Sequence, residues 1–98
     1  MKIVAITACP TGIAHTYMAA EKLEKTAKKL GHSIKVETQG AMGIENEITQ
    51  DEADAADAVI IAADIAIERE ERFERVRKIC VPVQDALKNP EAIFESIK

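Results

Sequence analysis

Two short runs of apolar residues constrain the fold of this chain more than any other feature of its sequence. Ile3–Ile6 and Ala58–Ala63 contain no polar residue, and each is about as long as a single strand. Uninterrupted apolar runs are typical of strands that are covered on both faces, as in parallel sheets, whereas half-exposed strands alternate. The two runs therefore predict buried strands over residues 2–8 and 58–63 at the centre of a parallel sheet.

Helical patterns separate the predicted strands. Over residues 13–30, apolar residues recur every three or four positions, and the pattern ends at Gly31, a residue that commonly terminates helices. Thr49, with Glu52 three residues later, predicts a capping box at the start of a second, short helix. Strands that alternate with helices in this way indicate an α/β fold.

Two further strands are predicted at the edges of the sheet. Residues 32–38 alternate between apolar and polar, which is typical of an edge strand with one solvated face. Residues 77–83 are interpreted as the other edge, because Pro82 cannot donate a hydrogen bond to a neighbouring strand. Residues 65–75, rich in Glu and Arg, are interpreted as a solvated connection with one helical turn.

These elements predict one Rossmann-like domain over residues 1–98, with three layers, α/β/α, and a four-stranded parallel sheet. Numbered along the chain, the strands are expected in the order 2-1-3-4 with right-handed crossovers. In such sheets a ligand binds beyond the carboxyl ends of the strands, where the chain turns off in opposite directions. Cys9 and Asp64 follow the two strands that flank this point. Asp64 is a candidate supporting residue that orients the adjacent loop, faces a partner or caps a helix.

Composition excludes several classes of partner. The formal net charge of −4 disfavours nucleic acid, whose phosphates attract a surplus of Lys and Arg. No apolar run approaches the roughly 20 residues that span a bilayer, so direct membrane insertion is not expected, and no signal peptide is evident. Cys9 and Cys80 have no metal-ligand spacing. A reduced, cytosolic protein is expected, with Cys80 buried in the core.

The strongest functional signal directly follows the first predicted strand. Cys9 stands between that strand and the start of a long helix, where unpaired N–H groups and the helix dipole favour an anion. Such sites also favour the thiolate form of cysteine. Backbone N–H groups and the Thr11 and Thr16 hydroxyls are expected to hold a phosphoryl group on the Cys9 sulfur. The expected phosphate-binding loop comprises Pro10, Thr11, Gly12, Ile13, Ala14, His15 and Thr16. The alternative is that Cys9 is a small buried residue at a strand end.

The residue six positions after Cys9 separates two chemistries. Small tyrosine phosphatases have arginine there, whose planar fork stabilises the transferring phosphoryl group, and this chain has His15. The sequence also lacks an Asp-Pro pair, which commonly supplies the general acid of these enzymes. The loop therefore suits a carrier of phosphoryl groups better than a hydrolase. His15 either donates to a phosphate oxygen or bonds a backbone carbonyl, and the residues leave both roles open.

The chain resembles, over essentially its whole length, the IIB component of the fructose-type branch (fructose/mannitol superfamily) of the bacterial phosphoenolpyruvate-dependent sugar phosphotransferase system (PTS). The most specific resemblance lies in residues 9–20, and three further segments match: Val36–Gly40, Gly43–Asn46 and Val59–Asp64. One departure follows Arg72-Phe73, where the family often carries Gly-Lys and this chain has Glu74-Arg75.

The resemblance implies that the chain is a phosphotransferase. Cys9 would take a phosphoryl group from a phosphohistidine on a IIA domain and pass it to a sugar bound in the membrane-embedded IIC component. Fructose, giving fructose 1-phosphate, is the default sugar, and mannose or a related sugar is the alternative. The resemblance implies no metal or other cofactor and a cytoplasmic location, at the membrane through IIC. The alternative classes of function are a thiol phosphatase and a non-catalytic anion-sensing module. The sequence fits a free-standing IIB protein and a IIB domain of a longer IIBC or IIABC chain equally well.

Overall fold

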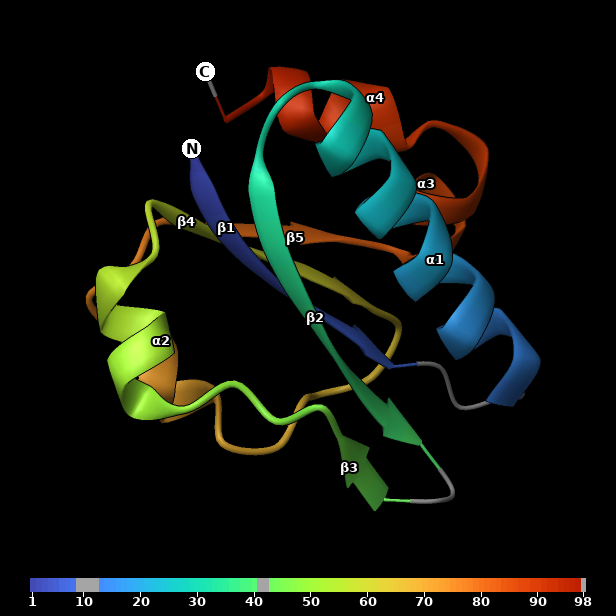
Figure 1. Ribbon diagram of the computed structural model, residues 1–98. Helices are drawn as coiled ribbons and strands as arrows, with labels where there is room; N and C mark the ends of the chain where they lie inside the picture. Colours follow the sequence, from blue (N-terminus) through green and yellow to red (C-terminus); the bar gives the residue numbers. More distant parts are fainter. Residues whose placement is uncertain (9–12, 41–42, 98) are drawn as a thin grey trace.

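The sheet of this protein has five strands in the order β3-β2-β1-β4-β5, seen in the computed structural model of Figure 1, which describes residues 1–8, 13–40 and 43–97. Strands β1, β2, β4 and β5 are parallel, and β3 is antiparallel to β2. The strands are β1 (Lys2–Ala8), β2 (Ser33–Gly40), β3 (Gly43–Glu45), β4 (Ala58–Ala63) and β5 (Lys78–Val81). The predicted order of the four parallel strands is confirmed.

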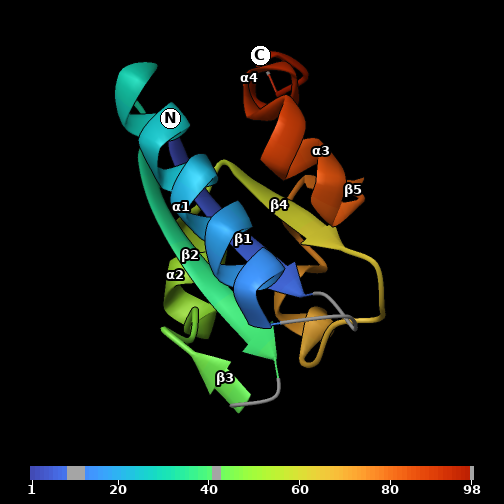
Figure 2. The same cartoon turned by 90° about the vertical axis from the view of Figure 1, so that its right-hand side faces the viewer.

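Helices cover both faces of this sheet, which gives the predicted three layers. Helices α1, α3 and α4 lie on one face, and α2 and the 3₁₀ helix η1 lie on the other (Figures 1 and 2). The helices are α1 (Ile13–Lys29), α2 (Gln50–Ala55), η1 (Glu70–Phe73), α3 (Val83–Lys88) and α4 (Pro90–Glu95). Within the described part of the chain, no helix combines the length and apolar character needed to cross a membrane.

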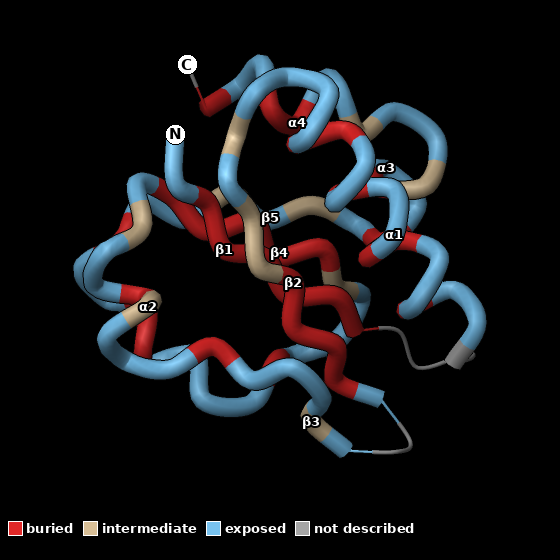
Figure 3. The backbone as a smooth tube through the Cα atoms, viewed as in Figure 1, coloured by how far each residue is buried: buried red, intermediate tan, exposed pale blue. Residues whose placement is uncertain are grey.

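The two central strands are apolar throughout because both of their faces are covered. In β1, Ile3 and Ala5 belong to the core on the α1 side, whereas Val4, Ile6 and Ala8 belong to the core on the α2 side. Figure 3 shows β1 and β4 as buried through most of their length. This arrangement is the one that the uninterrupted apolar runs predict.

The fifth strand was not expected from the sequence. Residues 39–44 contain two glycines, which is typical of a loop, but Gly40 pairs with Gly43 and Thr38 with Glu45 in an antiparallel ladder. A three-residue strand is too short to produce a recognisable alternation of apolar and polar residues. The sheet is therefore mixed, with four parallel strands and one short antiparallel edge strand.

The other edge of the sheet also departs from the prediction. Strand β5 ends at Val81, and Pro82 is the residue before α3 rather than a member of the strand. Cys80 is exposed, not buried. Because neighbouring residues of a strand point to opposite faces, Ile79 and Val81 pack on the α1 side and Cys80 points to the other face.

Candidate functional site

The described part of the predicted site lies at the carboxyl ends of the two central strands. Ala8, the last residue of β1, pairs with Ala63, the last residue of β4, and α1 begins at Ile13. Cys9, Pro10, Thr11 and Gly12 lie outside the described residues, so what the sequence predicts for them stays a prediction. The structure describes the rest of the predicted loop from the start of α1 onward.

The first turn of α1 is fastened to β1 by a buried hydrogen bond. The Thr7 hydroxyl donates to the Thr16 carbonyl oxygen at 3.0 Å, and both residues are buried. The Thr16 side chain is only 2% exposed, and its own hydroxyl has no hydrogen-bond partner among the described residues. A buried hydroxyl usually has a partner, because burying an unsatisfied one destabilises the fold. Among the described residues, Thr16 is thus an exception to this rule, and it stands where the sequence predicts a donor to phosphate.

The two residues that precede Thr16 in α1 are, by contrast, on the surface of the protein. Ala14 and His15 are exposed, so His15 is accessible to solvent at the start of α1. His32, the other histidine, lies at the opposite end of α1, where its ring stacks on Phe94 with 5.9 Å between ring centres.

Asp64 joins two of the elements that meet at this edge of the sheet. Its N–H donates to the Ala8 carbonyl oxygen at 3.2 Å, and its carboxylate Oδ1 accepts from the Val83 N–H, also at 3.2 Å. Val83 is the first residue of α3, whose N-cap is Pro82, so Asp64 caps this helix from outside it by accepting from an N–H group that has no partner within the helix. Of the roles considered from the sequence, the cap is the one that these contacts support directly.

Exposed apolar and aromatic side chains surround this edge. Met18, on α1, is 50% exposed, and Ile65, directly after Asp64, is 47% exposed. The Tyr17 hydroxyl donates to the Glu45 carboxylate on β3, and this hydrogen bond raises the pKa of Tyr17 above its ordinary value. The tyrosine therefore ties the first part of α1 to the outermost strand.

A buried group of polar residues was missed by the sequence analysis. We call Glu37, Gln39 and Arg72 the buried cluster; their side chains are 0%, 7% and 7% exposed. The Arg72 guanidinium donates to both Glu37 carboxylate oxygens, at 2.7 Å and 3.0 Å, and Gln39 Nε2 donates to Glu37 at 2.6 Å. The interpretation of β2 as a strand with one solvated face is therefore wrong, and so is that of residues 65–75 as a wholly solvated connection.

The charges of the buried cluster are set by its hydrogen bonds. Burial by itself raises the pKa of Glu37, but hydrogen bonds from Arg72, Gln39 and the Ile48 N–H outweigh burial, so the pKa of Glu37 lies below its ordinary value. The hydrogen bonds to Glu37 raise the pKa of Arg72. Glu37 and Arg72 are consequently an ionised pair at neutral pH. The one sequence signal near them was the family resemblance, since Glu37 lies in the matching segment Val36–Gly40 and Arg72-Phe73 directly precedes the position where the chain departs from the family.

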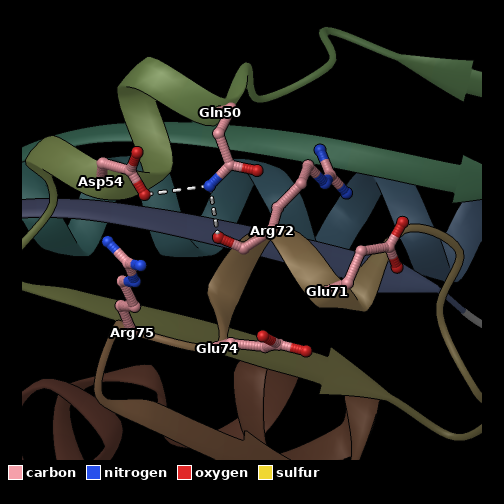
Figure 4. A pocket seen from close by; sticks show the side chains of 6 residues that line it. All are labelled: Gln50, Asp54, Glu71, Arg72, Glu74 and Arg75. Atoms are coloured by element: carbon pink, nitrogen blue, oxygen red, sulfur yellow. Dashed lines mark hydrogen bonds between the residues drawn. The ribbon is translucent and has the colours of Figure 1, made fainter.

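A cavity of about 300 Å³ lies between α2 and η1 on the same face of the sheet as the buried cluster (Figure 4). Gln50 crosses it, donating to Asp54 at 2.9 Å and to the Arg72 carbonyl oxygen at 3.0 Å. Its lining is formed by polar and charged residues, Gln50, Asp54, Glu71, Arg72, Glu74 and Arg75. None of the predicted phosphate-site residues that the structure describes lines this cavity.

Comparison with known proteins places these features in one family. The family model described as the lactose/cellobiose-specific IIB subunit of the PTS system matches residues 4–96. The PTS system fructose-like EIIB component 2 of Escherichia coli strain K12 is 52% identical over 97 residues, which cover 99% of this chain and 92% of that protein. The PTS system 2-O-alpha-mannosyl-D-glycerate-specific EIIABC component of the same strain is 50% identical over 93 residues, covering 95% of this chain and 14% of that protein.

Solved structures give the same result for the fold. A crystal structure of a domain from the fructose-specific IIABC component of Borrelia burgdorferi is similar with a TM-score of 0.93 and 52% identity. The similarity covers 98% of this chain and 91% of that one. The solution structure of an enzyme IIB subunit from Escherichia coli K12 has a TM-score of 0.91 at 42% identity, covering 98% of this chain and 89% of that one.

Proposed function

The chain belongs to the IIB family of the phosphoenolpyruvate-dependent sugar phosphotransferase system, and from this we propose that it carries a phosphoryl group on Cys9. The members of this family are phosphotransferases in sugar uptake, and this chain is a IIB domain of the fructose-like kind. The observation that carries the proposal is the order of elements around Cys9. It directly follows Ala8, the end of a central strand, and α1 begins four residues later at Ile13.

The proposed reaction has two phosphoryl transfers and no redox change. In the first, the P–N bond of a donor phosphohistidine breaks and a P–S bond forms to the Cys9 thiolate. In the second, the P–S bond breaks and a P–O bond forms to a sugar hydroxyl, whose proton leaves. Backbone N–H groups from about Thr11 to Thr16 would stabilise the charge on the three phosphoryl oxygens in both steps. The unpartnered Thr16 hydroxyl supports this, since it would gain an acceptor.

The test is to identify the phosphorylated residue. After incubation with a fructose-type IIA domain phosphorylated on its histidine, intact mass and peptide mapping should show one phosphoryl group, on Cys9. Cys9→Ser should carry no cysteinyl phosphate. Cys80→Ser is the matched control, because it removes the other thiol, which is exposed, and should be phosphorylated like the wild type. Phosphate on His15 or His32 would contradict the proposal.

The proposed partners are a IIA domain as donor and a sugar-loaded IIC component as acceptor. Relatives that contain a matching segment are named EIIABC and EIIBC components, which supports partners of this kind. Residues 1–98 would act as a single domain, held at the cytoplasmic side of the membrane by IIC. The expected assay is sugar phosphorylation in membranes that contain IIC, which should require both this chain and a phosphorylated IIA domain.

Fructose, converted to fructose 1-phosphate, is the proposed sugar. Relatives named for fructose-like sugars and for 2-O-alpha-mannosyl-D-glycerate are 52% and 50% identical to this chain, so mannose or a related sugar is the second candidate. The sugar is bound by IIC, and the product formed with the cognate IIC identifies it. Fructose 1-phosphate and a mannose phosphate have the same mass, so NMR of that product against authentic standards distinguishes the two.

Two other classes of function have distinct signatures. A thiol phosphatase would hydrolyse an aryl phosphate with repeated turnover. His15, at the position where such phosphatases have arginine, disfavours this activity. An anion-sensing module would leave sugar phosphorylation unaffected when Cys9 is replaced. We expect neither result.

A further inference from the structure

The buried cluster of Glu37, Gln39 and Arg72 has no part in the transfer steps proposed above. Stability alone gives little reason for ionised residues there, because apolar residues of similar size often replace a buried ion pair without loss. The surroundings are apolar, and Ile48 and Phe73 belong to the same core. What a fully bonded polar network adds is a fixed orientation of the groups that it joins.

Many of the cluster's hydrogen bonds go to backbone atoms after β4. Gln39 bonds both backbone groups of Glu68, donating to its carbonyl oxygen at 3.0 Å and accepting from its N–H at 2.8 Å. Arg72 donates to the carbonyl oxygens of Arg69 at 2.8 Å and Glu68 at 3.3 Å. These four bonds hold residues 68–69 against the end of β2.

The backbone held in this way begins beside the end of β1. We call residues 64–69 the crossover segment. Its first residue, Asp64, donates to the Ala8 carbonyl oxygen, and Gln39 lies directly opposite Ala8 in the register of β1 and β2. The segment is therefore fastened to β1 at one end and to β2 at the other. The exposed residues Ile65 and Ala66 lie between the two attachments.

We propose that the buried cluster positions the phosphoryl-transfer site. It holds the end of β2 and the crossover segment in a fixed relation to Ala8, the residue that precedes Cys9 in the chain. This inference rests on the proposed function, because the position of Cys9 matters only if Cys9 carries the phosphoryl group. A displacement of about 1 Å at a reacting group can slow a reaction by up to about a hundredfold.

Gln39→Met tests the inference with little change in shape. Methionine is similar in length but cannot bond Glu68, whereas Glu37 keeps its bonds to Arg72 and to the Ile48 N–H. We expect the transfer of phosphate from a phosphorylated fructose-type IIA domain, at saturating donor, to be about tenfold slower, with cooperative unfolding retained. The Asp64 amide, at the other end of the crossover segment, should exchange with deuterium faster in the variant.

Gln50→Met is the matched control. It removes two hydrogen bonds on the same face, to Asp54 and to the Arg72 carbonyl oxygen, but none to the crossover segment. Its transfer rate and Asp64 exchange should equal those of the wild type. Glu37→Met with Arg72→Met removes the ion pair as a unit, and this double variant should fold and also transfer slowly.

The outcomes separate the two proposals. If the wild type accepts phosphate on Cys9 and Gln39→Met accepts it equally fast while folded, the positioning role is wrong and the proposed function stands. If Gln50→Met is slowed as much as Gln39→Met, the effect is general destabilisation and the positioning role is again wrong. If the wild type accepts no phosphate, the proposed function fails and the inference falls with it.

Discussion

The Thr16 side chain is buried, but among the described residues its hydroxyl has no hydrogen-bond partner. Its methyl group lies in a buried site in the first turn of α1. The backbone of the same residue is fixed, because its carbonyl oxygen accepts from Thr7. The free hydroxyl is explained if it serves the phosphoryl group proposed for Cys9.

Thr16→Val should therefore raise stability and lower activity. Valine keeps the shape and removes the unsatisfied hydroxyl, so the free energy of unfolding should rise by about 1 kcal/mol, as measured by urea denaturation. Phosphate transfer to Cys9 should slow. Thr16→Ser keeps the hydroxyl and loses a buried methyl group, so it should be less stable by about 1 kcal/mol but transfer normally. Wild-type transfer by the valine variant would show that the hydroxyl has no role.

At the scale of the element, the ends of the helices carry the clearest agreement between sequence and structure. Helix α1 ends at Lys29, and Gly31 terminates it as expected, with a φ of +82° and an N–H that donates to the Lys28 carbonyl oxygen at 3.2 Å. The next N–H, that of His32, donates to the Ala27 carbonyl oxygen at 2.8 Å. This pair of bonds is the Schellman motif, which needs a left-handed residue where Gly31 stands.

Gly31→Ala tests that requirement by itself. A Cβ atom at Gly31 would meet nothing within 4 Å, so strain in the backbone is the only expected cost. We expect a loss of about 1 kcal/mol in the free energy of unfolding, and a smaller loss for Gly31→Asn, because asparagine tolerates the left-handed region better. Denaturation curves of the three proteins would measure this, and equal stability of the alanine variant would contradict it.

The capping box of α2 predicts a dependence of stability on pH. Lys35, at 2.7 Å, and the Thr49 N–H, at 2.9 Å, bond the Glu52 carboxylate and lower its pKa to about 2. The folded-state pKa of Glu52 is below its ordinary value of 4.5, so the ionised carboxylate adds to the free energy of unfolding. This contribution is complete above about pH 4.5 and is lost as the pH falls towards 2.

Glu52→Gln should abolish this contribution. The difference in the free energy of unfolding between wild type and variant should be largest near neutral pH and shrink between about pH 4.5 and 2. Urea denaturation across this range measures it. Glu24→Gln, at an exposed position of α1, is the control and should show a difference that varies less with pH. A difference for Glu52→Gln that grows as the pH falls would contradict the assignment.

At the scale of the whole molecule, stability should be greatest in the middle of the sheet. Strands β1 and β4 are covered by helices on both faces, whereas β3 has three residues at an edge and only one partner strand. Backbone amides of β1 and β4 should therefore exchange most slowly with deuterium, and those of β3 fastest among the strands. Exchange measured by NMR would show the order, and protection of β3 equal to that of β1 would contradict it.

Much of this architecture could be predicted from local patterns. The strand over residues 58–63 was predicted to the residue, and the capping box at Thr49 and Glu52 is present as expected. Cys80 was misjudged, because an apolar neighbourhood in the sequence does not say which face of an edge strand is covered. The short strand β3 was missed because three residues form no pattern.

The sequence by itself determined the order of the parallel strands, the helix ends and the family, because apolar periodicity, caps and motifs are recorded in neighbouring residues. Only the tertiary structure decided that Glu37 and Gln39 are buried. Their partner Arg72 lies 35 positions from Glu37 along the chain. Without Arg72, these polar side chains would need water molecules as hydrogen-bond partners and would not be buried. A polar residue's burial depends on the partner that the fold brings to it, and local sequence does not contain that partner.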